Sequence, residues 1–249
     1  MGKAMTTKII GTGSSVPEQI VTNDDLAKFV DTSDEWIRTR TGIRERRIAS
    51  EKSGTSQLAA EAARKALENA GIEASELDII ILATSSGDCC FPSGACQVQA
   101  AIGADRAAAF DINAACSGFI YAFHTVHSFF QAGIYKTGLI VGADTLSKLV
   151  DWNDRSTCVL FGDGAGAAVV RAEESGTLTM TMGSDGAKGS VLECGARSTG
   201  NFLTKQKPEL GYMTMDGQEV FKFAVKTVPE AIKKVLDEGN TDISEIKYF

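Results

Sequence analysis

The sequence predicts an α/β fold built from two similar halves, of which the second is incomplete. Three observations lead to this prediction. Continuous runs of aliphatic residues alternate with segments of helical periodicity along the 249 residues, which is typical of a parallel or mixed sheet with helices on both faces. Several helical segments end at a glycine, the usual helix stop. Finally, one helix, turn and strand pattern occurs twice.

The first elements are a short apolar strand and two short helices. The second helix carries Trp36 and begins at a capping box, in which Thr32 and Glu35 supply the two side chains. In order, the predicted bounds are a strand at residues 8–13, a helix from Asn23 to Val30, and a helix ending near Gly42.

The middle of the chain alternates longer helices with aliphatic strands. A long helix is expected to end at Gly71. The predicted elements are a helix at 55–70, a strand at 77–84, a helix at 93–102 and a strand at 138–143.

Cys116 lies between a predicted buried strand at residues 107–115 and a predicted helix at 117–131, which is apolar nearly all round and therefore expected to be buried. A sharp strand-to-helix turn would put this cysteine at a helix N-terminus, where the thiolate is favoured. A thiolate attacks carbonyl carbons, so Cys116 is a candidate nucleophile. The alternative is that Cys116 is a small buried hydrophobic residue.

The internal repeat suggests how the chain is organised. Each copy is interpreted as a helix, a turn and the start of a buried strand. Lys65, Leu67, Ser75, Glu76, Leu77, Ile79 and Ile80 recur 169 positions later as Lys234, Leu236, Ser244, Glu245, Ile246, Tyr248 and Phe249. A terminal carboxylate in a core strand would be desolvated, so we expect the second half to continue beyond Phe249 or to be completed by other residues.

Composition excludes some classes of function. The net charge of −7 argues against nucleic acid as the main partner. The six cysteines include no C-x-x-C pair, which argues against a zinc site or a dithiol redox centre. No signal peptide or long apolar span is recognised, so a cytoplasmic protein with reduced thiols and no membrane partner is expected.

Two glycine patterns and two histidines are interpreted as structural. Residues 162–167 fit the spacing of a dinucleotide loop but lead into a strand, so close backbone packing is expected instead of phosphate binding. Residues 11–15 are interpreted as a turn. His124 and His127 share a helix face with no carboxylate nearby in the sequence, so neither a metal site nor a cofactor is predicted.

Several motifs in the same order resemble the beta-ketoacyl-acyl-carrier-protein synthase III family of condensing enzymes, along essentially the whole chain. The matching stretches are residues 8–13, 32–37, 39–46, 111–119, 161–168 and 219–222. The resemblance implies the thiolase-like fold, five alternating αβαβα layers made from two halves. We therefore expect an N-terminal half at 1–175 that carries the nucleophile and a partial C-terminal half at 176–249.

The resemblance also implies an activity. Cys116 would take the acyl group from a short acyl-CoA, most simply acetyl-CoA, with its own backbone N–H as one candidate oxyanion donor. Malonyl-acyl carrier protein would then lose carbon dioxide and attack the acyl-cysteine, giving a 3-oxoacyl-acyl carrier protein at the start of fatty-acid synthesis. Coenzyme A is a substrate here, and no cofactor is implied.

The other site residues follow from positions that match the family. Trp36 and Arg155 would sandwich the adenine of coenzyme A, Thr32 would hydrogen-bond it, and Arg40 would lie near its phosphates. Phe91 would reach across a homodimer interface into the partner's acyl pocket and favour a short primer. Lys222 would dock the carrier protein.

The chain departs from the family in one respect. The histidine and asparagine used for decarboxylation, and a glycine of the oxyanion hole, have no match up to Phe249. We therefore expect the isolated chain to be inactive or limited to acylation. The alternatives are a related acyl-CoA condensing enzyme of the same fold, a non-catalytic half-subunit, and a cysteine hydrolase, for which no matched base is found.

Overall fold

The computed structural model describes residues 5–51, 53–195, 198, 200–204, 207, 209 and 211–248. The chain divides into two compact units. Unit 1 comprises the described residues within Met1–Asn23, Ile43–Lys148 and Gly162–Thr177, and unit 2 those within Asp24–Gly42, Leu149–Phe161 and Leu178–Phe249. The last junction is near the predicted boundary at residue 175, but two segments of the first half belong to unit 2. The division into halves at 1–175 and 176–249 stays a prediction.

Unit 1 contains a five-stranded mixed sheet, as predicted. Strand β4 is parallel to its neighbours β5 and β6, and β7 is antiparallel to β6 and β1. In order across the sheet the strands are β1 (Thr6–Ser15), β7 (Asp163–Glu173), β6 (Thr137–Thr145), β4 (Ile79–Ala83) and β5 (Ala108–Ile112).

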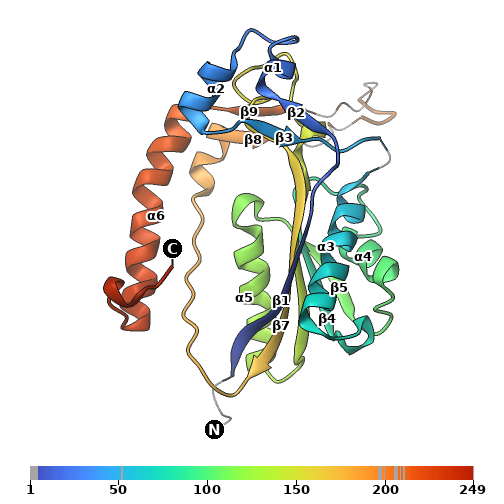
Figure 1. The fold of residues 1–249 in the computed structure, drawn as a ribbon, viewed down its shortest axis with the longest axis vertical. Helices are drawn as coiled ribbons and strands as arrows, with labels where there is room; N and C mark the ends of the chain where they lie inside the picture. The colour runs from blue at the N-terminus through green and yellow to red at the C-terminus, as the bar shows by residue number, and fades with distance from the viewer. Residues whose placement is uncertain are drawn as a thin grey trace. The chain divides into compact units, whose positions relative to one another are not determined.

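Helices cover both faces of this sheet, which explains its continuous aliphatic strands (Figure 1). Helices α3 (Thr55–Ala70) and α4 (Gly94–Ile102) lie on one face, and α5 (Gly118–Gln131) lies on the other. Side chains of alternate residues of β4 pack on opposite faces of the sheet. Ile80 and Leu82 belong to the core under α3 and α4, whereas Ile79 and Ile81 belong to the core under α5.

The glycines at residues 11–15 are not in a turn, because Gly11 and Gly13 lie inside β1. A Cβ added at Gly13 would come within 2.3 Å of the Ala62 carbonyl oxygen, and one at Gly11 within 2.5 Å of the Ala66 carbonyl oxygen. These glycines therefore let the backbone of α3 approach the sheet more closely than any side chain would allow.

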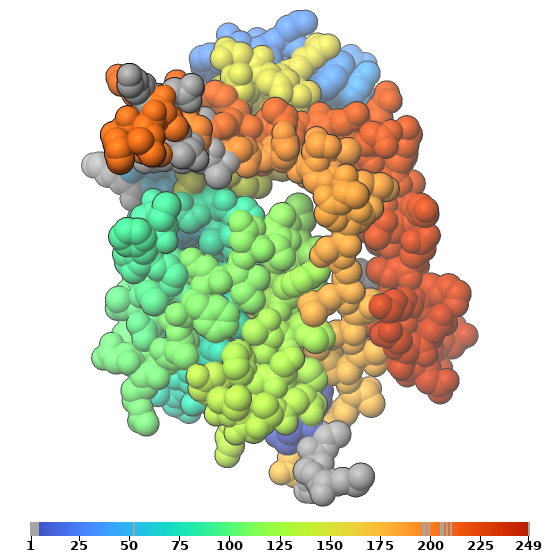
Figure 2. Space-filling model, turned by 180° about the vertical axis from the view of Figure 1, so that it is seen from behind, coloured from blue at the N-terminus to red at the C-terminus, as the bar shows by residue number. Residues whose placement is uncertain are grey.

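Two predictions of burial around Cys116 are wrong. Strand β5 is five residues long and only partly buried, because it is the edge strand and pairs with β4 alone. Only one stripe of α5 is fully buried, formed by Gly118, Ala122, Val126 and Phe130. Atoms of α5 reach the molecular surface in the space-filling view (Figure 2, light green). The apolar surface of α5 is thus larger than the area that one face of the sheet covers.

The first predicted helix is shorter than expected, because α1 (Asn23–Leu26) ends four residues before Val30. The Asn23 side chain is engaged in unit 1: its amide donates to the Ile43 carbonyl at 2.8 Å, and its oxygen accepts from Arg46 at 2.8 Å. Asn23 therefore fastens the strand pair β2 (Ile20–Thr22) and β3 (Glu45–Arg47) instead of capping a long helix.

In unit 2, helix α2 (Asp34–Thr41) ends at Gly42 as predicted, but its cap is Ser33 instead of Thr32. The Ser33 hydroxyl accepts from the Trp36 N–H at 3.1 Å, so the predicted capping box is wrong by one residue. The other elements of this unit are η4 (Gly186–Val191), β8 (Leu192–Cys194), β9 (Met213–Met215), α6 (Gly217–Gly239) and η5 (Ile243–Glu245). Within the described residues, no helix combines the length and the apolar character needed to cross a bilayer.

The internal repeat is visible in the backbone. Helix α3 ends at Gly71 with φ 66°, and α6 ends at the equivalent Asn240 with φ 47°, both left-handed. A single 3-10 turn follows in each copy, η1 (Ala74–Glu76) and η5. The predicted strand after the second turn is absent at residues 246–248, and Phe249 lies outside the described residues.

Candidate active site

Cys116 occupies a sharp turn between β5 and α5, as predicted. A 3-10 turn, η2 (Ala115–Ser117), carries the cysteine, and α5 begins two residues later. Ala115 has φ 44°, a left-handed conformation that alanine rarely adopts, so the backbone just before the cysteine is strained. The Cys116 side chain is exposed, whereas Cys158 is buried. Cys116 is therefore not a buried hydrophobic residue.

The thiol of Cys116 faces a hollow of about 270 Å³ in unit 1. Most of its wall consists of small residues at the ends of β4 and β6 and at the start of β7. Phe119 is the one aromatic residue that the structure describes in the wall. Its lining residues are Ala83, Ala115, Cys116, Phe119, Gly142, Ala143, Asp144, Gly162 and Gly164. The space beside the thiol suits a small, mostly apolar group.

The dinucleotide-like glycine pattern is structural, as predicted, since β7 begins at Asp163. A Cβ added at Gly162 would come within 3.1 Å of both the Arg46 Cβ and the Arg47 carbonyl oxygen. The absence of a side chain at Gly162 thus permits close packing and leaves the hollow open.

Polar side chains lie at the carboxyl ends of three adjacent strands, β6, β4 and β5. We call Asp144, Ser85 and Asn113 the polar row. The Ser85 N–H donates to Asp144 Oδ1 at 2.9 Å, and the Ser85 hydroxyl donates to Asn113 Oδ1 at 2.9 Å. Asn113 in turn accepts from the Ala115 N–H at 3.4 Å. The polar row therefore reaches from β6 to the turn that carries Cys116.

Two carboxylates fix helix N-termini near this edge of the sheet. Asp111, on β5, accepts from the Gly94 and Ala95 N–H groups of α4 at 2.7 Å each. Asp88 accepts from the Thr55 and Ser56 N–H groups of α3 at 2.8 Å each. Burial alone would raise the pKa of Asp88, but the hydrogen bonds from Ser56 and Thr55 and the nearby Lys148 lower it overall.

In unit 2, the structure brings Trp36, Arg40 and Arg155 together. The guanidinium carbon of Arg40 lies 4.6 Å from the centroid of the Trp36 ring, and that of Arg155 lies 5.1 Å from it. Arg155 also donates to the Asp31 carbonyl at 2.9 Å and pairs with the Asp31 carboxylate at 3.5 Å. An aromatic face beside two cations is suited to a base that carries phosphate.

Thr32 precedes this helix, and its hydroxyl oxygen is buried with no hydrogen-bond partner among the described residues. The hydroxyl is left over because Ser33 takes the capping role. A buried hydroxyl without a partner costs free energy, so a ligand or water that reached it would be stabilised.

The remaining predicted residues are on the surface. Phe91 is 86% exposed, an unusual state for a large apolar side chain. Lys222 lies on α6 and pairs with Glu219 at 2.6 Å, and this contact raises the pKa of Lys222.

Of the two histidines of α5, His127 makes a packing contact, as predicted. His127 Nδ1 lies 2.9 Å from the Thr7 hydroxyl, which ties α5 to β1. Burial and the neighbouring His124 lower the pKa of His127. Among the described residues, no group of three or more histidine, cysteine or acidic side chains is arranged to hold a metal.

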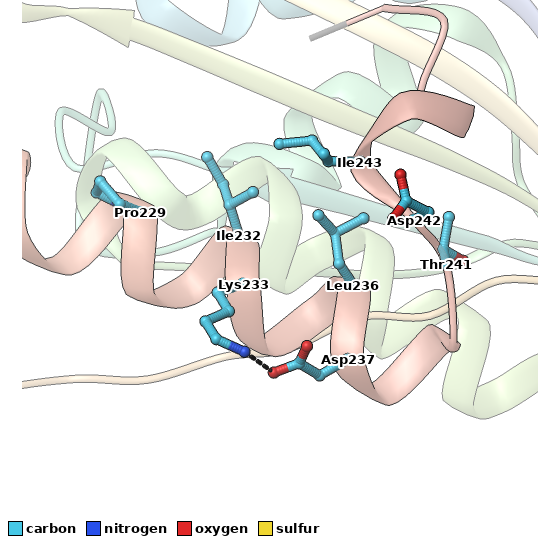
Figure 3. Close-up of a pocket in the computed structure, with 8 residues that line it drawn as sticks. All are labelled: Pro229, Ile232, Lys233, Leu236, Asp237, Thr241, Asp242 and Ile243. Atoms are coloured by element: carbon cyan, nitrogen blue, oxygen red, sulfur yellow. Dashed lines mark hydrogen bonds and ion pairs between the residues drawn. The ribbon is translucent and has the colours of Figure 1, made fainter.

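A second hollow, of about 460 Å³, lies where α6 meets η5 in unit 2 (Figure 3). The apolar side chains of Ile232, Leu236 and Ile243 line it, and its polar rim includes the ion pair of Lys233 with Asp237 at 2.6 Å. Among the described residues, its lining includes no cysteine, serine or histidine. In the repeat, Leu236 corresponds to Leu67, which is buried in the core of unit 1.

Sequence reasoning missed the polar row and Asp31. Asp144 and Ser85 each follow a predicted strand, and polar residues at the carboxyl ends of adjacent strands are a recognisable signal of a site. Asn113 gave no such signal, because the strand predicted at 107–115 includes it. Asp31 gave no such signal, because its contact with Arg155 joins segments 124 positions apart.

Comparisons with known proteins agree with this geometry. Residues 110–186, which include Cys116 and the start of β7, match the family model for 3-oxoacyl-[acyl-carrier-protein (ACP)] synthase III. The chain is 51% identical over 244 residues to the beta-ketoacyl-[acyl-carrier-protein] synthase III of Clostridium acetobutylicum, covering 97% of this chain and 75% of that protein. It is 48% identical to the enzyme of that name from Xylella fastidiosa, covering 100% of this chain and 76% of that protein.

Solved structures confirm the predicted thiolase-like α/β fold class. The crystal structure of 3-oxoacyl-[acyl-carrier-protein] synthase III from Aquifex aeolicus matches with a TM-score of 0.87 at 47% identity, covering 97% of this chain and 74% of that one. Identity of this level over nearly the whole chain, together with the cysteine turn, shows that the chain belongs to the beta-ketoacyl-[acyl-carrier-protein] synthase III family.

Proposed function

We propose that this protein is an acyltransferase that condenses a short acyl-CoA with malonyl-acyl carrier protein at the start of fatty-acid synthesis. The products are a 3-oxoacyl-acyl carrier protein, free coenzyme A and carbon dioxide. The observation that carries this proposal is the exposed Cys116, held on a strained turn beside a small hollow, in a chain of this family.

The first half of the reaction is acyl transfer to Cys116. The thiolate attacks the thioester carbonyl, an oxyanion forms, and coenzyme A leaves as its thiol after taking up a proton. Amide N–H groups at the turn, with that of Cys116 as the candidate, would stabilise the oxyanion. The hollow of about 270 Å³ supports a short acyl chain as the transferred group.

The second half forms the carbon–carbon bond. Malonyl-acyl carrier protein loses carbon dioxide, and the resulting enolate carbon attacks the acyl-cysteine carbonyl. The bond to the Cys116 sulfur breaks, and the thiolate returns to its starting state. The coenzyme A thioester is consumed as a substrate, so the scheme needs no cofactor.

Unit 2 supplies features that suit the nucleotide of coenzyme A. Trp36 and Arg155 offer an aromatic face and a guanidinium plane for the adenine, and Arg40 offers a charge for phosphate. The unpartnered hydroxyl of Thr32 would gain a hydrogen bond from the base.

The proposal includes partners and a compartment. The exposed Phe91 supports a homodimer in which this ring enters the partner's acyl pocket, and Lys222 supports docking of an acidic carrier protein. The six cysteines, without a C-x-x-C pair, support a reducing cytoplasmic setting.

Incubation with acetyl-CoA followed by mass spectrometry of the intact chain tests the proposal. We expect one acetyl group per chain, located on Cys116 by peptide mapping and absent from the Cys116→Ala variant. The matched control is Cys96→Ala, which removes another cysteine of the same unit and should leave labelling unchanged. No adduct on the folded wild-type chain, or an adduct on a different residue, would contradict the proposal.

A further inference from the structure

The side-chain amide of Asn113 has a defined orientation. A backbone N–H can only donate, so the atom that faces the Ala115 N–H at 3.4 Å must be the amide oxygen. The same oxygen accepts from the Ser85 hydroxyl at 2.9 Å. One atom of Asn113 thus joins the loop after β4 to the turn that carries Cys116.

Ser85, which donates to Asn113, is itself held by hydrogen bonds. Ser85 is held by its own N–H, which donates to Asp144 Oδ1 at 2.9 Å. That carboxylate oxygen also accepts from the hydroxyls of Thr84 at 3.1 Å and Ser86 at 2.6 Å. Asp144 therefore fixes Ser85 to β6, and Ser85 fixes Asn113.

The turn needs such a support because Ala115 has φ 44°. A non-glycine residue in the left-handed region is strained and persists only when its surroundings hold it there. Attack on a thioester requires the sulfur to approach the carbonyl along a narrow range of directions. A turn that relaxed toward ordinary φ values would point the thiol elsewhere.

We propose that Asn113 is a positioning residue for Cys116, acting through the Ser85 to Asn113 to Ala115 contacts that hold the strained turn. Asn113 does not touch the reacting atoms in this role. The inference rests on the proposed function, because it concerns the acyl transfer assigned to Cys116.

The test compares two reactions of the same thiol. Transfer from acetyl-CoA depends on the direction of attack, whereas alkylation by iodoacetamide, a small reagent free to approach from many sides, depends mainly on the thiolate fraction. The ratio of the two rates therefore reports positioning and cancels changes in ionisation. The Asn113→Ala variant should lower this ratio about five- to tenfold, the effect expected from losing two neutral hydrogen bonds. Ser85→Ala, which removes one of them, should lower it about threefold.

Two further variants complete the design. Asn113→Asp retains an oxygen that accepts both bonds, so the ratio should return to within twofold of the wild type. Asn69→Ala is the matched control, because Asn69 also accepts a backbone N–H, from Thr12 at 2.9 Å, but joins α3 to β1. Its ratio should not change. Thermal unfolding of each variant verifies that it is folded.

The outcomes separate the inference from the proposed function. If the wild type is alkylated on Cys116 but accepts no acyl group, the proposed function fails. If the wild type is acylated and Asn113→Ala keeps the wild-type ratio, the positioning role is overturned. The role is also overturned if both rates fall together or if Asn69→Ala lowers the ratio equally.

Discussion

Trp36 is the residue on which the proposed nucleotide site depends most. Its ring lies within cation–π distance of two guanidinium groups, from Arg40 four residues away and from Arg155 on a distant segment. Arg155 is held in place by the carbonyl and the carboxylate of Asp31. Contacts between protein groups alone therefore hold Arg155 beside the Trp36 ring.

Removing either side of this stack should weaken coenzyme A binding. We expect Trp36→Ala and Arg155→Ala each to cost about 1–3 kcal/mol of binding free energy, the range for a base that loses its stacking partner. Isothermal titration calorimetry with coenzyme A measures this. Trp152→Ala, which removes the other tryptophan of unit 2, is the matched control and should bind normally. Unchanged affinity in both stacking variants would place the adenine elsewhere.

At the scale of elements, the glycines of β1 let the backbone of α3 approach the strand closely. A Cβ at Gly13 would lie 2.3 Å from the Ala62 carbonyl oxygen and 2.4 Å from the Ala66 nitrogen, both backbone atoms of a helix. Because both are backbone atoms, the clash with an added methyl group cannot be relieved by moving a flexible side chain.

Gly13→Ala should therefore destabilise the fold by about 1–3 kcal/mol, the usual cost of overpacking a core. Urea unfolding followed by circular dichroism gives the free energy. Gly166→Ala, on the neighbouring β7, is the control, since nothing lies within 4 Å of a Cβ placed there. Equal stability of the two variants would show that α3 does not approach β1 this closely.

The N-terminus of α3 provides a pH-dependent prediction. The pKa of Asp88 is below its usual value of 3.8, so its contribution to stability is present above about pH 4 and is lost as the pH falls through the lowered pKa. At pH 7, Asp88→Ala should reduce the free energy of unfolding by about 0.5–2 kcal/mol, the cost of losing a helix cap.

The difference between Asp88→Ala and the wild type should shrink at acid pH, because the wild-type carboxyl then becomes protonated. Urea unfolding at pH 7 and at about pH 3 tests this sign. Asp105→Ala removes an exposed carboxylate of the same unit and should change stability by less than about 0.5 kcal/mol at both pH values. If the difference in unfolding free energy between Asp88→Ala and the wild type grew at acid pH, the lowered pKa of Asp88 would be contradicted.

At the scale of the whole molecule, the net charge of −7 opposes binding of an acidic carrier protein. The proposed docking would therefore use local positive charge. The lysines of α6 are partly neutralised on their own helix, since Lys222 pairs with Glu219 at 2.6 Å and Lys233 with Asp237 at 2.6 Å. Such exposed pairs are weak and can be exchanged for a partner's carboxylates.

Lys222→Ala should weaken binding of acidic acyl carrier protein about two- to fivefold at low ionic strength and leave coenzyme A affinity unchanged. The difference should fade as salt rises, because exposed charges are screened. Surface plasmon resonance at several salt concentrations measures it. Lys233→Ala, on the same helix and also paired with an acid, is the control. Equal effects of both variants would show that the positive charge of α6 acts as a whole, and that Lys222 is not a specific docking position.

Local signals in the sequence predicted several helix ends and the turn that carries the candidate nucleophile Cys116. Helix stops at Gly42 and Gly71 are confirmed, because a left-handed residue after a helix depends only on its own backbone freedom. The turn at Cys116 is confirmed for a similar reason, since an apolar strand followed closely by an apolar helix leaves few residues for the connection.

Predictions failed where adjacent residues compete for the same role, or where the contacting residues are far apart in the sequence. Ser33 caps α2 in place of Thr32, and both are hydroxyl residues that only geometry distinguishes. The glycines of β1 resemble turn residues until α3 is placed against them. Burial of β5 was overestimated, because an apolar run does not reveal whether a strand has one neighbour or two.

The sequence by itself therefore determined the α/β class, the succession of helices and strands that form the five-stranded sheet and its cover, and Cys116 as the candidate nucleophile. Those features depend on periodicity and on hydrogen bonds between residues a few positions apart. Only the tertiary structure decided which distant groups meet: Asp144 with Ser85, Ser85 with Asn113, and Arg155 with Asp31 and Trp36. The physical reason is that such contacts depend on the order of strands in the sheet and on chain crossings, which no local pattern of residues encodes.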